Sequence, residues 1–285
     1  MPRMNVVNLA LTRLFDLVFA PLASVPPFVS LAILSLLVAM GMLWVFKRTS
    51  NQTAIAAAKD RITAGVFEIR LFNDDLVQIF RAQGGILRHN LTYFGLSLVP
   101  LAWMILPFVL LMAQLQFRYG FDGFHVGDEP LLTVELKPDW RADLPQVDEG
   151  ARPPAELETP AGVTSETPAV WLPAKNELAW RLAPEREGSY EVAVKLGDRT
   201  YTKTLQVADG GVAKRSPLRH DGSILDALLY PMEPSLPDGP VKAIRLTYPD
   251  ATVWFLGWQW HWLIVFFVLS VVFAFALKDR FGVTI

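Results

Sequence analysis

The stretch FVSLAILSLLVAMGMLWVF, from Phe28 to Phe46, decides the fold class of this chain. Its 19 residues include no Lys, Arg, Asp or Glu, and the same holds for two runs of 27 residues each, 91–117 and 251–277. About 20 apolar residues in a helix cross the ~30 Å hydrocarbon core of a bilayer, whereas a buried helix of a soluble protein is usually shorter and interrupted by charge. The sequence therefore predicts three transmembrane helices. The second contains Pro100 and Pro107, which membrane helices tolerate when neighbours compensate for lost hydrogen bonds.

The charges between these runs predict an orientation. Segment 47–90 has 7 Lys/Arg against 4 Asp/Glu, a net charge of +3, and segment 118–250 has 15 against 22, a net charge of −7. Positive charge in short loops next to spans stays in the cytoplasm. We therefore expect 47–90 and the tail 278–285 inside, and 118–250 and the N-terminus outside. Because Lys47 and Arg48 follow the first run instead of preceding it, a cleaved signal peptide is not expected.

The segments outside the spans differ in character. Residues 1–27 have apolar side chains at helical spacing up to Val18 and then Pro21, Pro26 and Pro27, which predicts an amphipathic helix in the outer interface; an extension of the first span is the alternative. Segment 47–90 contains two apolar stripes of helical period around Asn73-Asp74-Asp75, residue types that cap a helix N-terminus. It is predicted to be a cytoplasmic helical hairpin, either with a solvated face or with a docking surface for a partner. Its candidate contact residues are Arg61, Arg70, Arg81 and Arg88.

Segment 118–250 is predicted to be an inserted extracytoplasmic β-sandwich domain, of immunoglobulin-like appearance. It holds 15 of the 21 prolines, which suit loops and strand edges. Alternating or β-rich patterns occur at 131–136, 177–182, 190–196, 200–207 and 241–248. Gly197-Asp198 between two of these strands is a hairpin signal. Residues 139–165 are expected to form a linker or long loop, and 223–229 a short helix.

Four tryptophans around one histidine open the third apolar run. Indole rings prefer the boundary between hydrocarbon and headgroups, so these residues are expected to anchor a helix end at the outer interface. The alternatives are contacts with neighbouring subunits, or a bound pigment or lipid. The candidate residues are Trp254, Trp258, Trp260, His261 and Trp262.

No pattern in the sequence indicates catalysis. His89, His125, His220 and His261 are far apart and have no partner at ligand spacing, and the chain has no cysteine. The spans contain no ionisable residue except His261, which disfavours a pump, channel or transporter. No basic patch with interleaved aromatic residues indicates nucleic-acid binding. We expect no enzyme activity, no metal and no cofactor.

The order of the segments resembles that of the YidC/oxidase-assembly insertase superfamily. In that order, a span that starts outside is followed by a basic cytoplasmic hairpin, a second span, an outer segment and an inward span. The likeness is greatest to the minimal three-span members of this superfamily, such as the corresponding subunit of the endoplasmic reticulum membrane complex, and covers 28–117 and 251–280. It implies an insertase or chaperone with a hydrophilic, positively charged groove in the bilayer. The candidates for such a groove are Ser35, Thr92, Ser97 and Gln114, while the nearest positive charges lie at the cytoplasmic span ends.

Three motifs also resemble an uncharacterised bacterial membrane-protein family that brings no established activity. They are KRTSNQ at 47–52, EIRLFNDD at 68–75, and HWL at 261–263 with the run up to Lys278. The function expected from the sequence is a non-enzymatic scaffold or accessory subunit in the bacterial inner membrane, bound to other integral membrane proteins and to the lipid bilayer. An insertase or chaperone is the first alternative. A membrane-anchored extracytoplasmic sensor or binding module is the second.

Overall fold

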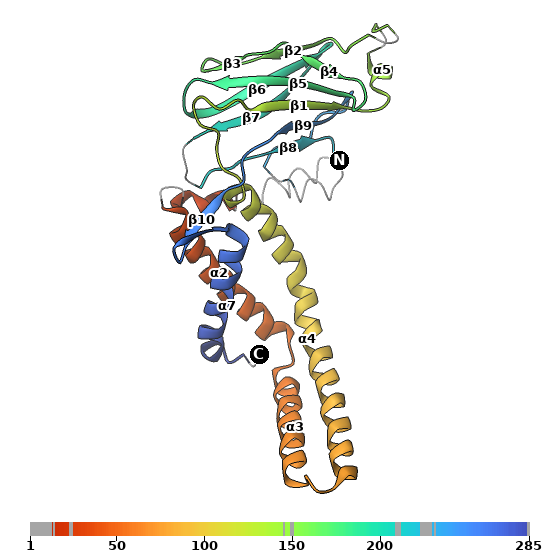
Figure 1. Cartoon of the computed structure of the whole chain (residues 1–285), viewed down its shortest axis with the longest axis vertical. Helices are drawn as coiled ribbons and strands as arrows, with labels where there is room; N and C mark the ends of the chain where they lie inside the picture. Colours follow the sequence, from red (N-terminus) through yellow and green to blue (C-terminus); the bar gives the residue numbers. More distant parts are fainter. Residues whose placement is uncertain are drawn as a thin grey trace. The chain divides into compact units, whose positions relative to one another are not determined.

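The computed structural model describes residues 13, 15–22, 25–144, 146–148, 151–208, 212–222, 230 and 232–283 (Figure 1). These residues form two compact units. One, here called the β unit, takes the described residues up to Ser30 and Leu110–Leu263. The other, the helical unit, takes Leu31–Val109 and the described residues from Ile264 onward.

Three helices are long and apolar enough to cross a membrane: α2 (Pro27–Thr49), α4 (Leu76–Tyr119) and α7 (Trp262–Phe281). Helix α2 begins at Pro27, a residue suited to the first helical position because its fixed φ is already helical and its missing N–H would have no helical partner. Lys47 and Arg48 occupy the last turn of α2, where the helix dipole favours positive charge. Three apolar helices of this length are compatible with a multi-pass membrane protein.

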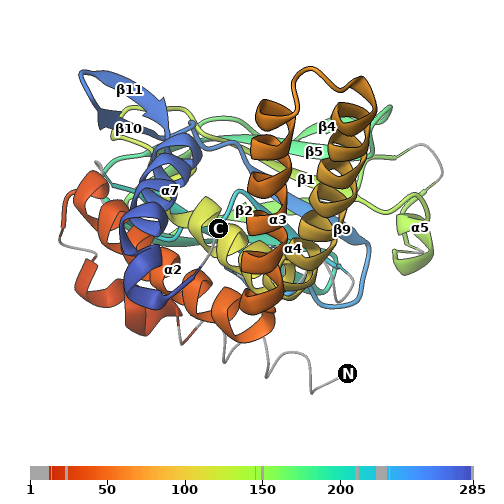
Figure 2. The same ribbon diagram turned by 90° about the horizontal axis from the view of Figure 1, so that it is seen from below.

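Helix α3 (Gln52–Leu71) and the first part of α4 run side by side in the helical unit (Figures 1 and 2). The side chain of Asn51 caps α3 by accepting a hydrogen bond from the Ala54 N–H at 3.0 Å. Asp75 accepts one from the Val77 N–H at 2.9 Å and so caps α4. The second hairpin helix and the second span, which the sequence divided at residue 90, are one helix of 44 residues. No capping residue or chain break separates them.

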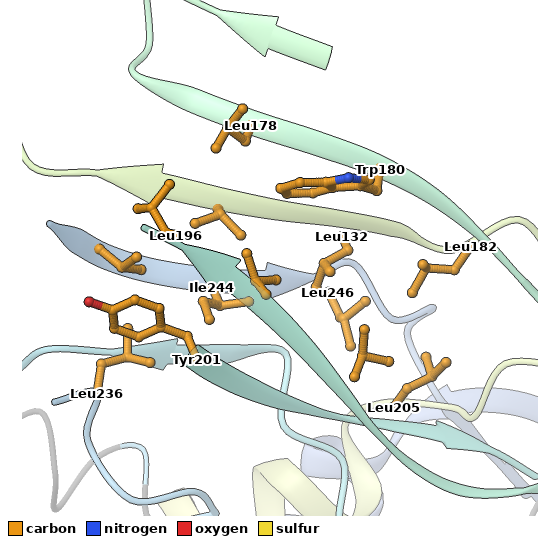
Figure 3. Packing of buried hydrophobic residues seen from close by; sticks show 14 of the residues in the cluster. Leu132, Leu178, Trp180, Leu182, Leu196, Tyr201, Leu205, Leu236, Ile244 and Leu246 are labelled. Carbon is orange, nitrogen blue, oxygen red and sulfur yellow. The ribbon is translucent and has the colours of Figure 1, made fainter. Parts of the chain in front are cut away.

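Of the antiparallel sheets described in the β unit, two share one hydrophobic core. The larger has the strand order β3-β5-β1-β9-β8 with β4 paired to β5, and the smaller has the order β2-β6-β7. Figure 3 shows residues such as Trp180 and Leu246 of the larger sheet and Leu205 of the smaller one in this core. The strands are β1 (Leu131–Leu136), β2 (Ala155–Glu158), β3 (Val163–Ser165), β4 (Val170–Leu172), β5 (Glu177–Pro184), β6 (Gly188–Leu196), β7 (Arg199–Val207), β8 (Leu218–His220) and β9 (Val241–Leu246).

The predicted β6–β7 hairpin is confirmed. Leu196 pairs with Arg199 across the two-residue turn Gly197-Asp198, and Gly197 has a φ of 61°. Two-residue hairpin turns need positive φ, which glycine adopts at no steric cost. A side chain at Gly197 would also collide with Leu144, since a Cβ there would lie 2.7 Å from the Leu144 Cδ2.

The expectation of a structureless segment at 139–165 was wrong. It contains the short helix α5 (Trp140–Asp143) and the strands β2 and β3. Trp140 is fully buried and meets Trp171 edge to face. The proline- and glutamate-rich composition concealed these elements because β2 is ordered by pairing with β6, a contact between distant parts of the sequence.

The third helix was expected from residue 251, and this start was also wrong. Residues 252–261 form a β-hairpin of β10 (Thr252–Phe255) and β11 (Trp258–His261), and α7 begins only at Trp262. Leu256 and Gly257 both have positive φ, at 51° and 85°, which is the backbone of a tight hairpin turn. An apolar run does not distinguish strand from helix by its hydrophobicity alone.

Two further predicted helices lie wholly or mainly outside the described residues. The short helix expected at 223–229 lies outside the described residues, as does most of the N-terminal helix expected within 1–27. Within that N-terminal stretch, residues 15–19 are helical and are followed by the 3-10 helix η1 (Ala20–Leu22).

Candidate functional site: a cleft between the apolar helices

The helical unit contains an apolar cleft of about 310 Å³ between α2, α4 and α7, here called the interhelical cleft. Its only lining residue with a polar side chain is Ser270, and side chains such as Met104 and Phe108 form its α4 wall. The lining residues are Val38, Ala39, Met42, Leu101, Met104, Ile105, Phe108, Phe266, Phe267, Ser270, Val271 and Ala274.

The cleft exists because α2 and α7 pack closely while α4 exposes most of its surface. Ser35 is fully buried and its hydroxyl donates to the Phe266 carbonyl at 3.4 Å, which joins α2 to α7. In the most apolar window of each helix, 33% of α2 is buried but only 11% of α4. Helix α4 therefore offers an apolar surface to whatever lies beside it in a membrane.

Ser270 lines the interhelical cleft without exposing its hydroxyl there, since no polar surface of the described residues faces the cleft. Its Oγ is buried and has no hydrogen-bond partner within the described part of the chain. A buried hydroxyl without a partner costs free energy, because it has lost its bonds to water and gained none. The surface that the cleft offers to a neighbouring molecule is therefore wholly apolar.

The four residues proposed for a polar groove do not line this cleft. The Thr92 hydroxyl donates to the Arg88 carbonyl at 3.0 Å and the Ser97 hydroxyl to the Tyr93 carbonyl at 2.9 Å, so both bond within α4. Ser35 is used in the α2–α7 contact described above. Gln114 is buried in the β unit. Membrane helices commonly satisfy a hydroxyl on their own backbone in this way, which leaves it unavailable to a ligand.

The helical hairpin presents its arginines and an apolar patch together. Arg61, Arg70, Arg81 and Arg88 are all exposed. Apolar side chains around the turn are exposed as well and define the hairpin-tip patch; Leu71 is 74% exposed and Phe80 69%. The patch consists of Phe67, Leu71, Phe72, Leu76, Val77 and Phe80. A gathering of exposed apolar side chains in one part of a protein is typical of a protein or membrane contact.

The aromatic cluster divides into exposed and buried members. Trp254 and Trp258, on β10 and β11, are 65% and 68% exposed, and Trp260 is also exposed. Trp262 is buried and its Nε1 donates to the Gln116 Oε1 at 3.2 Å. The His261 Nδ1 accepts a bond from the Leu263 N–H at 3.2 Å. Spacing alone did not show this division, because it depends on the strand-to-helix junction at residue 262.

Within the described ranges of the chain, no group of three or more His, Asp or Glu side chains is placed to hold a metal ion. No protein-family model, curated protein or solved structure matches the chain.

Proposed function

We propose that this protein is a non-enzymatic membrane scaffold or accessory subunit that holds a transmembrane helix of another integral membrane protein in the interhelical cleft. The observation that carries this proposal is the cleft itself, a recess of about 310 Å³ whose exposed surface is apolar. We place the protein in the bacterial inner membrane with the hairpin in the cytoplasm and the β unit outside. The charge difference between 47–90 and 118–250 supports this orientation.

The physical basis of such binding is packing, because lipid tails are as apolar as the helices they surround. Association of helices in a membrane is driven by van der Waals contact, interhelical hydrogen bonds and lipid entropy. The cleft supplies a concave apolar surface for van der Waals contact. In this scheme the hairpin-tip patch and its arginines form a second, cytoplasmic contact with the same partner complex.

Site-specific photo-crosslinking in the source cells tests the proposal. A photoreactive residue at Ile105, which lines the cleft, is expected to crosslink to a discrete membrane protein. The matched control is Leu106, which is 65% exposed and does not line the cleft; it is expected to crosslink to lipid. The substitution Ala274→Phe, which fills the cleft, is expected to abolish the protein crosslink at position 105. Val272→Phe, on the exposed surface of α7, is expected to leave it intact.

The proposal fails if position 105 crosslinks only to lipid, or if Ala274→Phe leaves the partner bound. Ser270→Ala tests whether packing alone is responsible. We expect an unchanged yield of partner in detergent, since the Ser270 Oγ is buried and the substitution removes little volume. A lower yield would show that the hydroxyl donates a hydrogen bond to the partner.

An insertase or chaperone is the second candidate, favoured by a cleft bounded by three spans next to a helical hairpin. An insertase lowers the cost of moving polar groups through hydrocarbon, where one central charge costs ~2.5–3.5 kcal/mol on insertion scales. Among the described residues, the cleft exposes no polar surface for that task. We therefore expect vesicles containing the purified chain to insert a single-span test protein no faster than empty vesicles. Faster insertion that Ala274→Phe blocks would replace the scaffold proposal with the insertase one.

A further inference from the structure

The β unit contains a second, charged cavity of about 100 Å³ where the first turn of α2 and the last turn of α4 adjoin residues 251–253. Its lining includes Pro27, Arg118, Asp122, Arg215, Ala251 and Thr252. Two guanidinium groups and one carboxylate therefore face a small space within a single unit of the fold. A cavity of this size has room for a group as large as a phosphate.

Arg118 is the more informative of the two arginines. It is only 5% exposed, its Nη2 donates to the Asp16 Oδ1 at 2.6 Å, and its guanidinium lies 4.2 Å from the centre of the Phe19 ring. Its Nε is buried and has no hydrogen-bond partner in the part of the chain that the structure describes. Asp16 is also bonded to Lys214, so this one carboxylate is shared between two cations. Arg118 is thus a buried cation that shares the carboxylate of Asp16 with Lys214.

Arg215 adds a second positive charge to the cavity wall. Its side chain is 2% exposed, and its Nη1 donates to the Phe121 carbonyl at 3.0 Å. Its Nη2 lies 3.8 Å from the Asp122 Oδ1, a carboxylate that is itself 42% exposed. Burial lowers the pKa of Arg215, but a guanidinium remains protonated at any physiological pH. The first turn of α2 adds the positive end of a helix dipole beside Pro27.

The position of this cavity along α4 indicates where an anion would come from. Arg118 directly follows the uncharged run that ends at Phe117, which is the outer end of the second span in the proposed membrane arrangement. We propose that the cavity binds the phosphodiester group of a membrane phospholipid, with Arg118 and Arg215 as its cationic contacts and the acyl chains extending along the apolar helices. Guanidinium groups suit this role because their fixed donors match phosphate oxygens.

Lipid titration of the detergent-solubilised full chain tests this assignment. Phosphatidylglycerol is expected to raise the melting temperature and to remain bound in native mass spectrometry. Two compounds serve as controls at the same concentration: diacylglycerol lacks the phosphate, and inorganic phosphate lacks the acyl chains. Neither is expected to raise the melting temperature or to remain bound in native mass spectrometry. Arg118→Gln is expected to weaken phosphatidylglycerol binding about tenfold or more, because it removes a charge-assisted contact. The matched control is Arg245→Gln, a change at an exposed side chain of β9, and this variant is expected to bind phosphatidylglycerol as the unmodified chain does.

A second variant keeps the test decisive if Arg118→Gln does not fold. Ala251→Leu leaves both arginines in place and fills the cavity, so it is expected to abolish phosphatidylglycerol binding by steric exclusion. Equal binding by Ala251→Leu and the unmodified chain would overturn the site. Stabilisation by inorganic phosphate equal to that by phosphatidylglycerol would overturn the lipid assignment and leave a site for a free oxyanion.

Discussion

Tyr248 illustrates how one side chain joins distant parts of the β unit. Its hydroxyl accepts a bond from the Gln206 N–H at 3.0 Å and donates to the Thr204 carbonyl at 3.3 Å, and its ring stacks on Phe124 at 4.6 Å. Burial raises the pKa of this phenol well above its ordinary value of 10.0, although the hydrogen bond from Gln206 acts in the opposite direction. The fold therefore holds Tyr248 in its neutral form.

This pKa predicts how stability changes in alkali. Since the folded pKa is raised, the contribution of Tyr248 to the unfolding free energy is complete below pH 10 and is lost as the pH rises toward the folded value. One fully coupled group contributes a slope of about 1.4 kcal/mol per pH unit. Tyr248→Phe is expected to cost about 1 kcal/mol at neutral pH, through the lost hydrogen bonds, and to make the alkaline loss shallower. Denaturant unfolding between pH 8 and 11 measures the unfolding free energy of the unmodified protein and of Tyr248→Phe. Parallel pH profiles for these two proteins would contradict the raised pKa of Tyr248.

The helical hairpin depends on a close approach between α3 and α4. Gly65 is buried, and a Cβ placed on it would lie 2.7 Å from the Ile86 Cγ1 of the facing helix. Ile55 and Ala58 of α3 and Ala82 of α4 are also buried along this pair. The missing side chain at Gly65 is therefore part of the packing, even though glycine lowers helix propensity.

A pair of glycine substitutions tests this contact. Gly65→Val is expected to separate the helices and to destabilise the hairpin by about 1–3 kcal/mol through overpacking. Gly84→Ala is the control on α4: nothing lies within 4 Å of its Cβ position, so it is expected to stabilise the helix by about 0.5–1 kcal/mol. Hydrogen exchange of α3 amides in the full chain measures both effects. Faster exchange in Gly84→Ala, or unchanged exchange in Gly65→Val, would show that the helices do not pack through this face.

The orientation of the whole molecule rests on charge, and the structure offers better positions for testing it than the sequence did. Asn73, in the turn of the hairpin, and Asp198, in the β6–β7 turn, are both exposed. Because the chain has no cysteine, a single cysteine at either position reports its own side of the membrane. We expect Asp198→Cys to react with an impermeant maleimide in intact cells and Asn73→Cys to react only after permeabilisation. Labelling of both from outside would remove the basis for the proposed cytoplasmic hairpin.

Several features could be predicted from the sequence because their causes are local. The three charge-free runs predicted the apolar helices, although the third run begins with a hairpin and is helical only from Trp262. The Gly197-Asp198 pair predicted its hairpin because the turn needs positive φ at that position. Asn73 to Asp75 similarly marked the turn before α4, where Asp75 supplies the cap.

Only the tertiary structure decided the features that depend on distant partners. Lys203 occupies an inward position of β7 and is fully buried, which is tolerated because Glu233 and the Ser216 carbonyl bind its ammonium group. Strands β2 and β3 form in a proline-rich segment because β6 and β5 supply their hydrogen bonds. The interhelical cleft likewise depends on how three helices pack, and the types of its lining residues do not predict it. The chain sequence alone determined which segments are apolar and where local turns fall; pairing and burial between remote segments determined the strands, the buried charges and the candidate sites.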